Sequence, residues 1–286
     1  MRRSDLSDAI RRFQLRLVPW LRFLGNRRHY TFLDEEGLRA RRRSETVFIF
    51  GSGSSLNELS AEEWKAIAEH DTFGFNWFVH ERFVRCDFHL VRGIPDTDVD
   101  PEVWRPQLAE YFELIRANPR FARTVFLVHG GFRAINGNRA VGYGLLPRES
   151  PVFRWRTNMR SDLPSRSFDA GLVHGHSTLQ ECINAAYLIG WKRIVLAGVD
   201  LYDRRYFWMA QDETRSVDAR RGAVASDSHS RAQSGMVGDL GRWKEWLAAE
   251  GVALTVLNPR SLLAAVLPVA DRAERVRGYP SEPCRP

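Results

Sequence analysis

The stretch Val47-Phe48-Ile49-Phe50-Gly51-Ser52-Gly53-Ser54-Ser55-Leu56 decides the fold. Four apolar, β-prone residues run directly into a glycine turn, and a helical pattern follows from Ser60. A buried parallel strand has this appearance when it enters a helix through a tight loop. Gly51 and Gly53 allow positive φ and close backbone approach. Serine hydroxyls and free N–H groups ahead of a helix favour negative charge, so this loop predicts a phosphate or nucleotide site, with a plain turn as the alternative.

A dinucleotide fingerprint does not fit the loop. It requires a third small residue where Leu56 stands, and an acidic residue after the next strand. That strand, 72–75, ends in Asn76 instead. The loop therefore favours a nucleotide or phosphate over NAD.

Length and composition indicate a globular protein of one large domain or two small ones. The chain has 286 residues, of which 44% are hydrophobic. It has no run of 18 apolar residues and no secretory signal pattern, so we expect no transmembrane helix and no export. Its three cysteines are far apart, which is typical of reduced thiols in a cytosolic protein.

The basic charge is concentrated at the N-terminus. The net charge is +7, and residues 1–43 hold twelve arginines against five acids, which is also +7. Arginines alternate there with bulky apolar residues, partly at helical spacing. We expect residues 1–44 to form a basic amphipathic extension that lies on an anionic membrane surface, so that the protein is cytoplasmic and peripheral on the inner membrane. A helix packed on the domain with a solvated arginine face is the alternative, and a nucleic-acid partner is not expected because the rest of the chain is neutral.

Strand and helix patterns alternate through the rest of the chain. We expect strands at 47–50, 72–75, 88–91, 124–128, 193–198 and 252–257, and helices near 60–70, 102–117, 178–189 and 236–250. This order predicts an α/β fold: a Rossmann-like, doubly wound, mostly parallel sheet in one domain over 45–268. Residues 132–175 read as a loop-rich insertion, 203–234 as a lid, and 269–286 as a disordered tail.

Polar residues follow several of the predicted strands. Asp200 and Tyr202 lie at the carboxyl end of the fifth strand, where open α/β sheets bind ligands. Ser177 and Gln180 form a capping-box pattern before a helix. The ligand edge then collects Gly51–Ser55, Asn76, Ser177, Thr178, Tyr202, Tyr206 and His229. Such hydroxyl and amide donors suit the departure of a phosphate from a nucleotide, with a histidine as base.

Asp96 and Asp98 carry an alternative reading. Two Asp-x-Asp pairs occur over 96–100, a spacing used to hold a metal and a diphosphate. This favours a magnesium-dependent nucleotidyl or diphosphoryl transferase. Acids ahead of a helix are also explained by the helix dipole alone.

Four blocks in order resemble the bacterial CMP-sialic-acid sialyltransferases of glycosyltransferase family 42 and the motility-associated-factor glycosyltransferases. They are 50–56, Thr72 to Phe78, Ser177-Thr178 through Ile189 to Tyr202, and Asn258 to Leu263, within about 46–268. The resemblance implies an inverting, metal-independent transferase on a single-domain variant of the GT-A type, which uses a CMP-sugar donor and no other cofactor.

The resemblance also implies roles for individual residues. Gly51, Ser52, Gly53 and Ser55 would lie against the CMP phosphate and ribose, and Asn76 would hold the donor or its leaving phosphate. Ser177 and Thr178 would contact cytidine or the sugar carboxylate. Tyr202 and Tyr206 would donate hydroxyls to the departing phosphate. The histidine between the lid and the next helix would be the base.

The chain departs from the family pattern at three positions. Ser52 stands where the family has asparagine, and a second family asparagine falls near Arg92. A gapless alignment places the family's catalytic histidine at Gln233, whereas a gapped one places it at His229. We take His229 as the base, with His176 as substitute.

The sequence therefore predicts a glycosyltransferase that moves an acidic sugar (sialic acid, a related nonulosonate or Kdo) from a CMP donor to a cell-surface glycan or lipid-linked acceptor. No metal is expected, and the oligomeric state is left open. Two rivals remain: the magnesium-dependent transferase, and a non-catalytic membrane-binding protein with a decayed site.

Overall fold

The computed structural model describes residues 3–92, 101–132, 134–202, 205–210 and 235–270, and side chains from Phe13 onward apart from those of 101–107. An eight-stranded sheet, with every neighbouring pair parallel, forms its centre in the order β1-β6-β5-β4-β3-β2-β9-β10. The strands are β1 (Thr31–Phe32), β2 (Thr46–Phe50), β3 (Asp71–Phe75), β4 (Phe88–Val91), β5 (Val125–His129), β6 (Pro151–Trp155), β9 (Arg193–Ala197) and β10 (Ala253–Val256).

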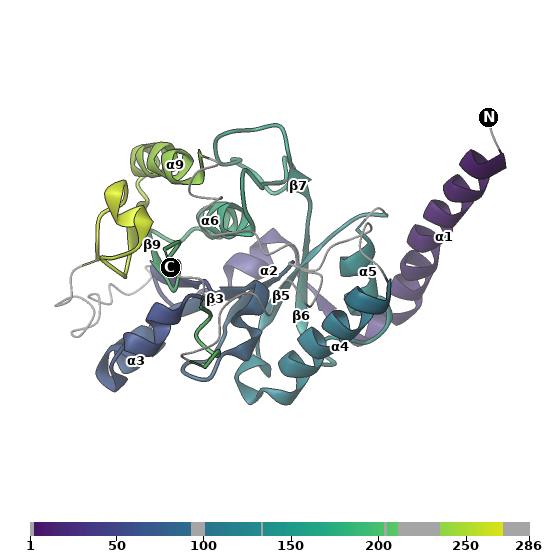
Figure 1. Ribbon diagram of the computed structural model, residues 1–286, viewed down its shortest axis with the longest axis horizontal. Helices are drawn as coiled ribbons and strands as arrows, with labels where there is room; N and C mark the ends of the chain where they lie inside the picture. Colours follow the sequence, from purple (N-terminus) through teal and green to yellow (C-terminus); the bar gives the residue numbers. More distant parts are fainter. Residues whose placement is uncertain (1–2, 93–100, 133, 203–204, 211–234, 271–286) are drawn as a thin grey trace.

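Helices cover both faces of this sheet (Figure 1). They are α1 (Arg3–Asn26), α2 (Glu35–Arg39), α3 (Ala61–Ala68), α4 (Pro101–Ala117), α5 (Ile135–Gly142), α6 (Thr178–Ile189) and α9 (Val237–Ala249). A short pair, β7 (Thr157–Asn158) and β8 (Leu172–Val173), lies beside α6. The doubly wound, parallel α/β fold expected from the sequence is confirmed.

Strand β2 shows why the helices divide between two faces. All five of its residues are buried, and successive side chains point to opposite faces. Val47 and Ile49 join the core that contains α6 and α9, while Phe48 and Phe50 join the core beneath α3, α4 and α5. A strand buried on both faces must be apolar throughout, which is the pattern of this stretch.

The sheet order reverses at β2. After β2 the chain builds β3, β4 and then β5 on one side, and it later crosses through α6 to place β9 on the other side. The carboxyl ends of β2 and β9 therefore lie side by side at the point where the strand order changes direction. Open α/β sheets bind ligands at such a switch point.

Part of the N-terminal segment belongs to this architecture. Thr31 and Phe32 pair with β6 as a parallel edge strand, and α1 packs along α5. Strand β6 lies in the stretch that the sequence presented as a loop-rich insertion, which was wrong for this part. The tail from 271 lies outside the described residues.

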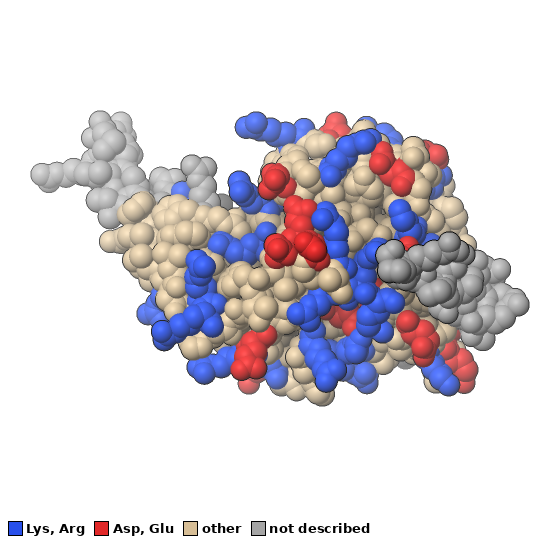
Figure 2. Space-filling model, turned by 180° about the vertical axis from the view of Figure 1, so that it is seen from behind, with Lys and Arg blue, Asp and Glu red and all other residues tan. Residues whose placement is uncertain are grey.

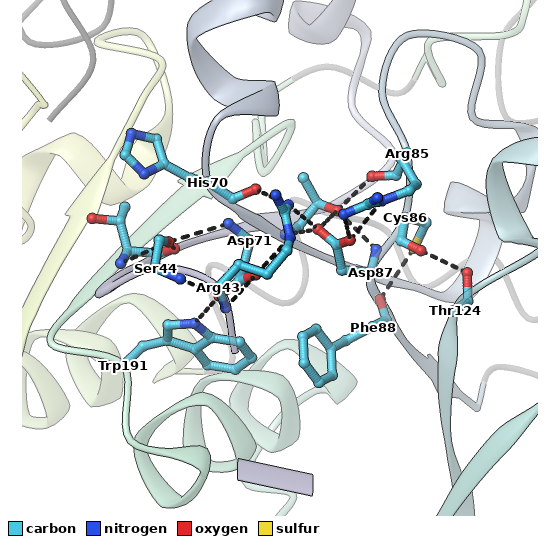
Figure 3. A network of polar contacts seen from close by, with 12 residues as sticks. Arg43, Ser44, His70, Asp71, Arg85, Cys86, Asp87, Phe88, Thr124 and Trp191 are labelled. Atoms are coloured by element: carbon cyan, nitrogen blue, oxygen red, sulfur yellow. Dashed lines mark hydrogen bonds and ion pairs between the residues drawn. The ribbon is translucent and has the colours of Figure 1, made fainter. Parts of the chain in front are cut away.

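A polar network ties the opposite, amino-terminal edge of the sheet together (Figure 3). The buried Asp71 carboxylate accepts hydrogen bonds from the Arg43 and Ser44 amides, at 2.9 and 3.1 Å, and from Trp191 Nε1 at 2.8 Å. Burial nevertheless raises the pKa of Asp71. Asp87 accepts from Arg43 and from the Thr72 amide. Both carboxylates accept hydrogen bonds from neighbouring segments of the chain, so at this edge of the sheet they stabilise the fold.

Candidate functional site

The loops after β2 and β9 are joined by backbone hydrogen bonds. The Gly51 amide donates to the Ala197 carbonyl at 2.8 Å, and the Gly53 amide donates to the Gly198 carbonyl at 2.7 Å. A Cβ at Gly51 would lie 2.4 Å from the Gly198 oxygen, and one at Gly53 would lie 2.3 Å from Asp200 Oδ2. Neither glycine has a positive φ, so that expectation was wrong. The two glycines are needed because the β9 loop approaches their backbone so closely.

Asp200 fills the anion position of the glycine loop. Its buried carboxylate accepts hydrogen bonds from the Ser55 amide at 3.0 Å, from the Ser55 hydroxyl, and from Asn258 Nδ2 at 2.9 Å. The donors of Ser55 that were expected to meet a ligand phosphate are therefore directed at a carboxylate of the chain itself. A short 3-10 turn, Ser54–Glu58, follows, and the capped helix α3 begins only at Ala61.

A cavity of about 150 Å³ opens beside this loop, at the carboxyl ends of β2, β3 and β9. Seven of the predicted site residues line it: Gly51, Ser52, Gly53, Asn76, Ser177, Asp200 and Tyr206. The others of its wall are Phe75, Trp77, Leu179, Gly198, Val199, Leu201 and Met236. Ser55, Thr178 and Tyr202 do not line it, and His229 lies outside the described residues.

A second cavity, of about 330 Å³, lies on the other side of the 3-10 turn. Its wall includes the carboxylates of Glu58 and Glu63 together with Leu56, Leu59 and Asn258. Glu58 is ion-paired with Arg260, and the Glu63 side chain accepts a hydrogen bond from the Ser60 amide at 2.9 Å, so both carboxylates have structural partners. The smaller cavity lies at the carboxyl ends of the central strands, where open α/β sheets bind ligands, and is therefore the better candidate site.

Two residues of this wall each carry a buried polar atom without a hydrogen-bond partner in the described structure: Asn76 Oδ1 and Ser177 Oγ. Ser177 is 3% exposed. Asn76 directly follows β3 and has φ of 49°, a left-handed conformation that costs energy in most residues. Buried polar groups are nearly always hydrogen-bonded, so orphaned ones in a cavity indicate a place for a polar ligand.

Ser177 is orphaned because the expected capping box does not form. It is the N-cap residue of α6, but its side chain makes no cap hydrogen bond. Gln180 Oε1 instead accepts from the His176 amide at 2.6 Å. The predicted start of the helix was right and the predicted hydrogen bonds were wrong. As a result, the Ser177 hydroxyl has no partner in the described structure, at the N-terminus of α6 where the helix dipole is positive.

Tyr202 does not line the smaller cavity, and its hydroxyl oxygen accepts a hydrogen bond from Asn258. Asn258 Nδ2 lies 3.1 Å from Tyr202 Oη and also donates to Asp200. Since the amide donates, the phenol keeps its own hydrogen for another acceptor. Burial raises the pKa of Tyr202, so the phenol is protonated at neutral pH. Arg260 stands over the same ring at 5.8 Å and is ion-paired with Glu58.

Tyr206 is held against the glycine loop. It forms an antiparallel bridge with Gly53, and the next amide, of Phe207, donates to the Ser52 carbonyl at 3.1 Å. Its ring stacks on Trp208, which in turn stacks on His80 with ring centres 4.1 Å apart. The start of the predicted lid is thus anchored to the loop, whereas residues 211–234 are outside the described part of the chain.

His176 is the described histidine next to the cavity wall. Its Nε2 lies 3.1 Å from Asp239 Oδ2, from α9. A carboxylate on one ring nitrogen fixes the orientation of an imidazole. His176 was expected only as a substitute for His229.

A polar cluster that the sequence did not single out lies at the neighbouring strand ends. The buried Glu181 carboxylate is ion-paired with Arg92 and lies 3.3 Å from His174 Nδ1. Thr157 Oγ1 accepts from Arg92 at 2.8 Å and lies 3.4 Å from His129 Nε2. Burial, with Arg92 and Arg154 nearby, lowers the pKa of His129 to about 4. Only the three-dimensional fold brings these separated residues together.

The described residues include no group of three or more His, Cys, Asp or Glu side chains that could hold a metal ion. Asp96 and Asp98, which carried the magnesium alternative, lie outside them. The described helices also include none long and apolar enough to cross a membrane.

No family model and no curated protein sequence matches the chain. Solved structures do match. The sialyltransferase CstII from Campylobacter jejuni, in complex with the substrate analogue CMP-3FNeuAc, is 14% identical with a TM-score of 0.46, over 81% of this chain and 87% of its own. A CST-II variant in complex with CMP is 16% identical with a TM-score of 0.44, over 79% and 86%. The monofunctional α-2,3-sialyltransferase Cst-I from Campylobacter jejuni is 16% identical with a TM-score of 0.44, over 82% of each chain.

Proposed function

We propose that this chain is a glycosyltransferase that binds a CMP-sugar in the cavity between the β2 and β9 loops and transfers an acidic sugar to a hydroxyl acceptor. One observation carries the proposal: two residues that line a cavity at the switch point of the sheet, Asn76 and Ser177, each carry a buried polar atom without a partner in the described structure. The sequence blocks that resemble sialyltransferases contain both residues.

The charge of the site fits departure of a nucleotide monophosphate. Neutral donors form part of the cavity wall, namely Ser52 and Ser177 at the N-terminus of α6, and the Asp200 carboxylate in the same wall is hydrogen-bonded by Ser55 and Asn258. Tyr202, whose hydroxyl is oriented by Asn258, would donate a hydrogen bond to the phosphate as the glycosidic bond breaks. Donors that are fixed in place before the reaction stabilise developing charge most effectively.

A base must remove the proton of the acceptor hydroxyl. His229 is the candidate from the sequence resemblance, and His176 is supported by its contact with Asp239. Transfer to a glycan or lipid-linked glycan, without a metal, remains part of the proposal. Sialic acid, a related nonulosonate and Kdo are the donor sugars to be compared.

The test is release of CMP from CMP-sialic acid and CMP-Kdo by the purified full chain, with excess EDTA and with added magnesium. We expect the wild-type chain to release CMP in EDTA. Only one of the two histidines is the base, so either His229→Gln or His176→Gln should lower the rate of release by two to four orders of magnitude, and the other should leave it near the wild-type rate. Release that requires magnesium would favour the rival transferase that uses Asp96 and Asp98. Absence of release in every arm, despite CMP binding, would contradict a catalytic function.

A further inference from the structure

Helix α1 has an exposed apolar face. Five of the ten exposed large hydrophobic side chains in the described structure lie on this one helix: Phe13, Leu15, Val18, Leu21 and Leu24. Leu21 is 56% exposed and Leu24 is 43% exposed. Val18, Leu21 and Leu24 recur every three residues, so they lie on one side of the helix. Phe13 also contacts the Phe132 ring, with ring centres 6.0 Å apart.

The other face of α1 is already occupied. Phe23 is buried, and its backbone approaches α5 so closely that a Cβ at Gly142 would lie 2.7 Å from the Phe23 amide nitrogen. Trp20 and Phe23 stack on each other, and Arg154 lies over the Phe23 ring at 4.1 Å. The helix therefore packs on the domain with one side, and the side that carries Leu21 and Leu24 is exposed.

Arginines accompany the exposed face. Arg22, Arg27 and Arg28 are exposed, and none of them forms an ion pair with a carboxylate of the described residues. Over residues 13–28 the sequence has no acid. Figure 1 shows α1 projecting from the body, and Figure 2 shows that end of the molecule as a tan surface bordered by blue side chains.

We infer that this face of α1 docks on an anionic lipid bilayer. The apolar side chains would enter the interfacial region while the arginines meet lipid phosphates, which is the binding mode of an amphipathic interfacial helix. A second copy of the chain is a poorer occupant, because it would bring two arginine-rich segments of the same charge together. Nucleic acid would satisfy the arginines but leave the apolar stripe in water.

The inference is independent of the proposed reaction. It rests on the surface of α1 alone and would hold for any enzyme whose acceptor is carried by a membrane. Its test therefore uses vesicle binding, and no substrate is required.

Flotation of the full chain with phosphatidylcholine vesicles, with and without phosphatidylserine, is the experiment. Binding is expected only with phosphatidylserine and should weaken at high salt. Leu21→Glu combined with Leu24→Glu should lower the partition coefficient at least tenfold, and Arg27→Gln or Arg28→Gln about fivefold each. Met159→Glu is the matched control, since Met159 is 70% exposed elsewhere on the surface and should leave binding unchanged.

Three outcomes would overturn the inference. The first is no flotation of the wild-type chain with anionic vesicles. The second is equal flotation of the Leu21→Glu, Leu24→Glu variant, with melting curves showing that both proteins are folded. The third is binding of another partner by this face. It would be seen as a concentration-dependent dimer that the same variant abolishes, or as RNA binding in place of vesicle binding.

Discussion

Replacing Ser177 with alanine separates ligand binding from helix capping. Its buried hydroxyl makes no cap hydrogen bond and has no described partner. Removing an unpartnered hydroxyl costs the unbound protein no hydrogen bond, so the free energy of unfolding should stay within about 0.5 kcal/mol of wild type or rise. Losing one neutral hydrogen bond to the ligand should weaken CMP binding by about 1 kcal/mol, which is about a fivefold increase in Kd.

Ser60 provides a matched control, because it caps α3 in the ordinary way. Its hydroxyl accepts from the Glu63 amide at 3.2 Å, and the Glu63 side chain accepts from the Ser60 amide at 2.9 Å. Ser60→Ala should therefore lower stability by about 1 kcal/mol, or Tm by about 2 °C, without changing CMP affinity. Urea unfolding and calorimetric titration measure both quantities. The reasoning fails if Ser177→Ala is destabilised as much as Ser60→Ala, or if its Kd for CMP is that of wild type.

Three further predictions concern neighbouring groups. Tyr202→Phe should lower kcat about a hundredfold while leaving CMP affinity within about fivefold, measured by CMP release and titration; an unchanged kcat would remove Tyr202 from the mechanism. Asp200→Asn places an amide where three donors from Ser55 and Asn258 converge on the carboxylate. Urea unfolding should therefore show a free energy of unfolding about 2 kcal/mol lower than that of wild type, and an unchanged value would contradict the role of this network. Burial and nearby arginines lower the pKa of His129 from 6.5 to about 4, so its contribution to stability is present above pH 6.5 and is lost as pH falls toward 4. As the pH falls from 6.5 to 4, the free energy of unfolding should therefore decrease less in His129→Asn than in wild type. The same pH dependence in both proteins would contradict this.

The central strands could be predicted from the sequence because each is a continuous apolar run. Strands β2, β3, β4 and β9 were all placed within one residue of their observed bounds. A strand buried on both faces leaves no other pattern. The parallel order followed from the alternation of these runs with helical patterns.

The edge of the sheet could not be predicted in the same way. Strand β6 begins with a proline and contains Arg154, and β1 has only two residues. Both exist because β5 offers a partner for β6 and β6 then offers one for β1. Such pairing depends on tertiary contacts that local sequence does not contain.

The sequence predicted many of the residues that meet at the candidate site, but it did not predict the hydrogen bonds that they make. The glycine loop, Asn76 and Ser177 do meet at one cavity. The loop's anion, however, is Asp200 itself, and the serine of the capping-box pattern makes no cap hydrogen bond. Spacing can place residues at one edge of a sheet, but which donor pairs with which acceptor is decided by distances of a few tenths of an ångström.

Selective binding of CMP is the most direct test of the proposed site. The measurement is the thermal shift of the full chain with CMP, CDP, UDP, GDP or ATP, in the presence of EDTA. A ligand present at a hundred times its Kd stabilises the folded state by about 2.7 kcal/mol, so a bound nucleotide should raise Tm by several degrees. We predict a shift with CMP that exceeds those with UDP, GDP and ATP. A shift selective for purine nucleotides, or none with CMP, would contradict the account.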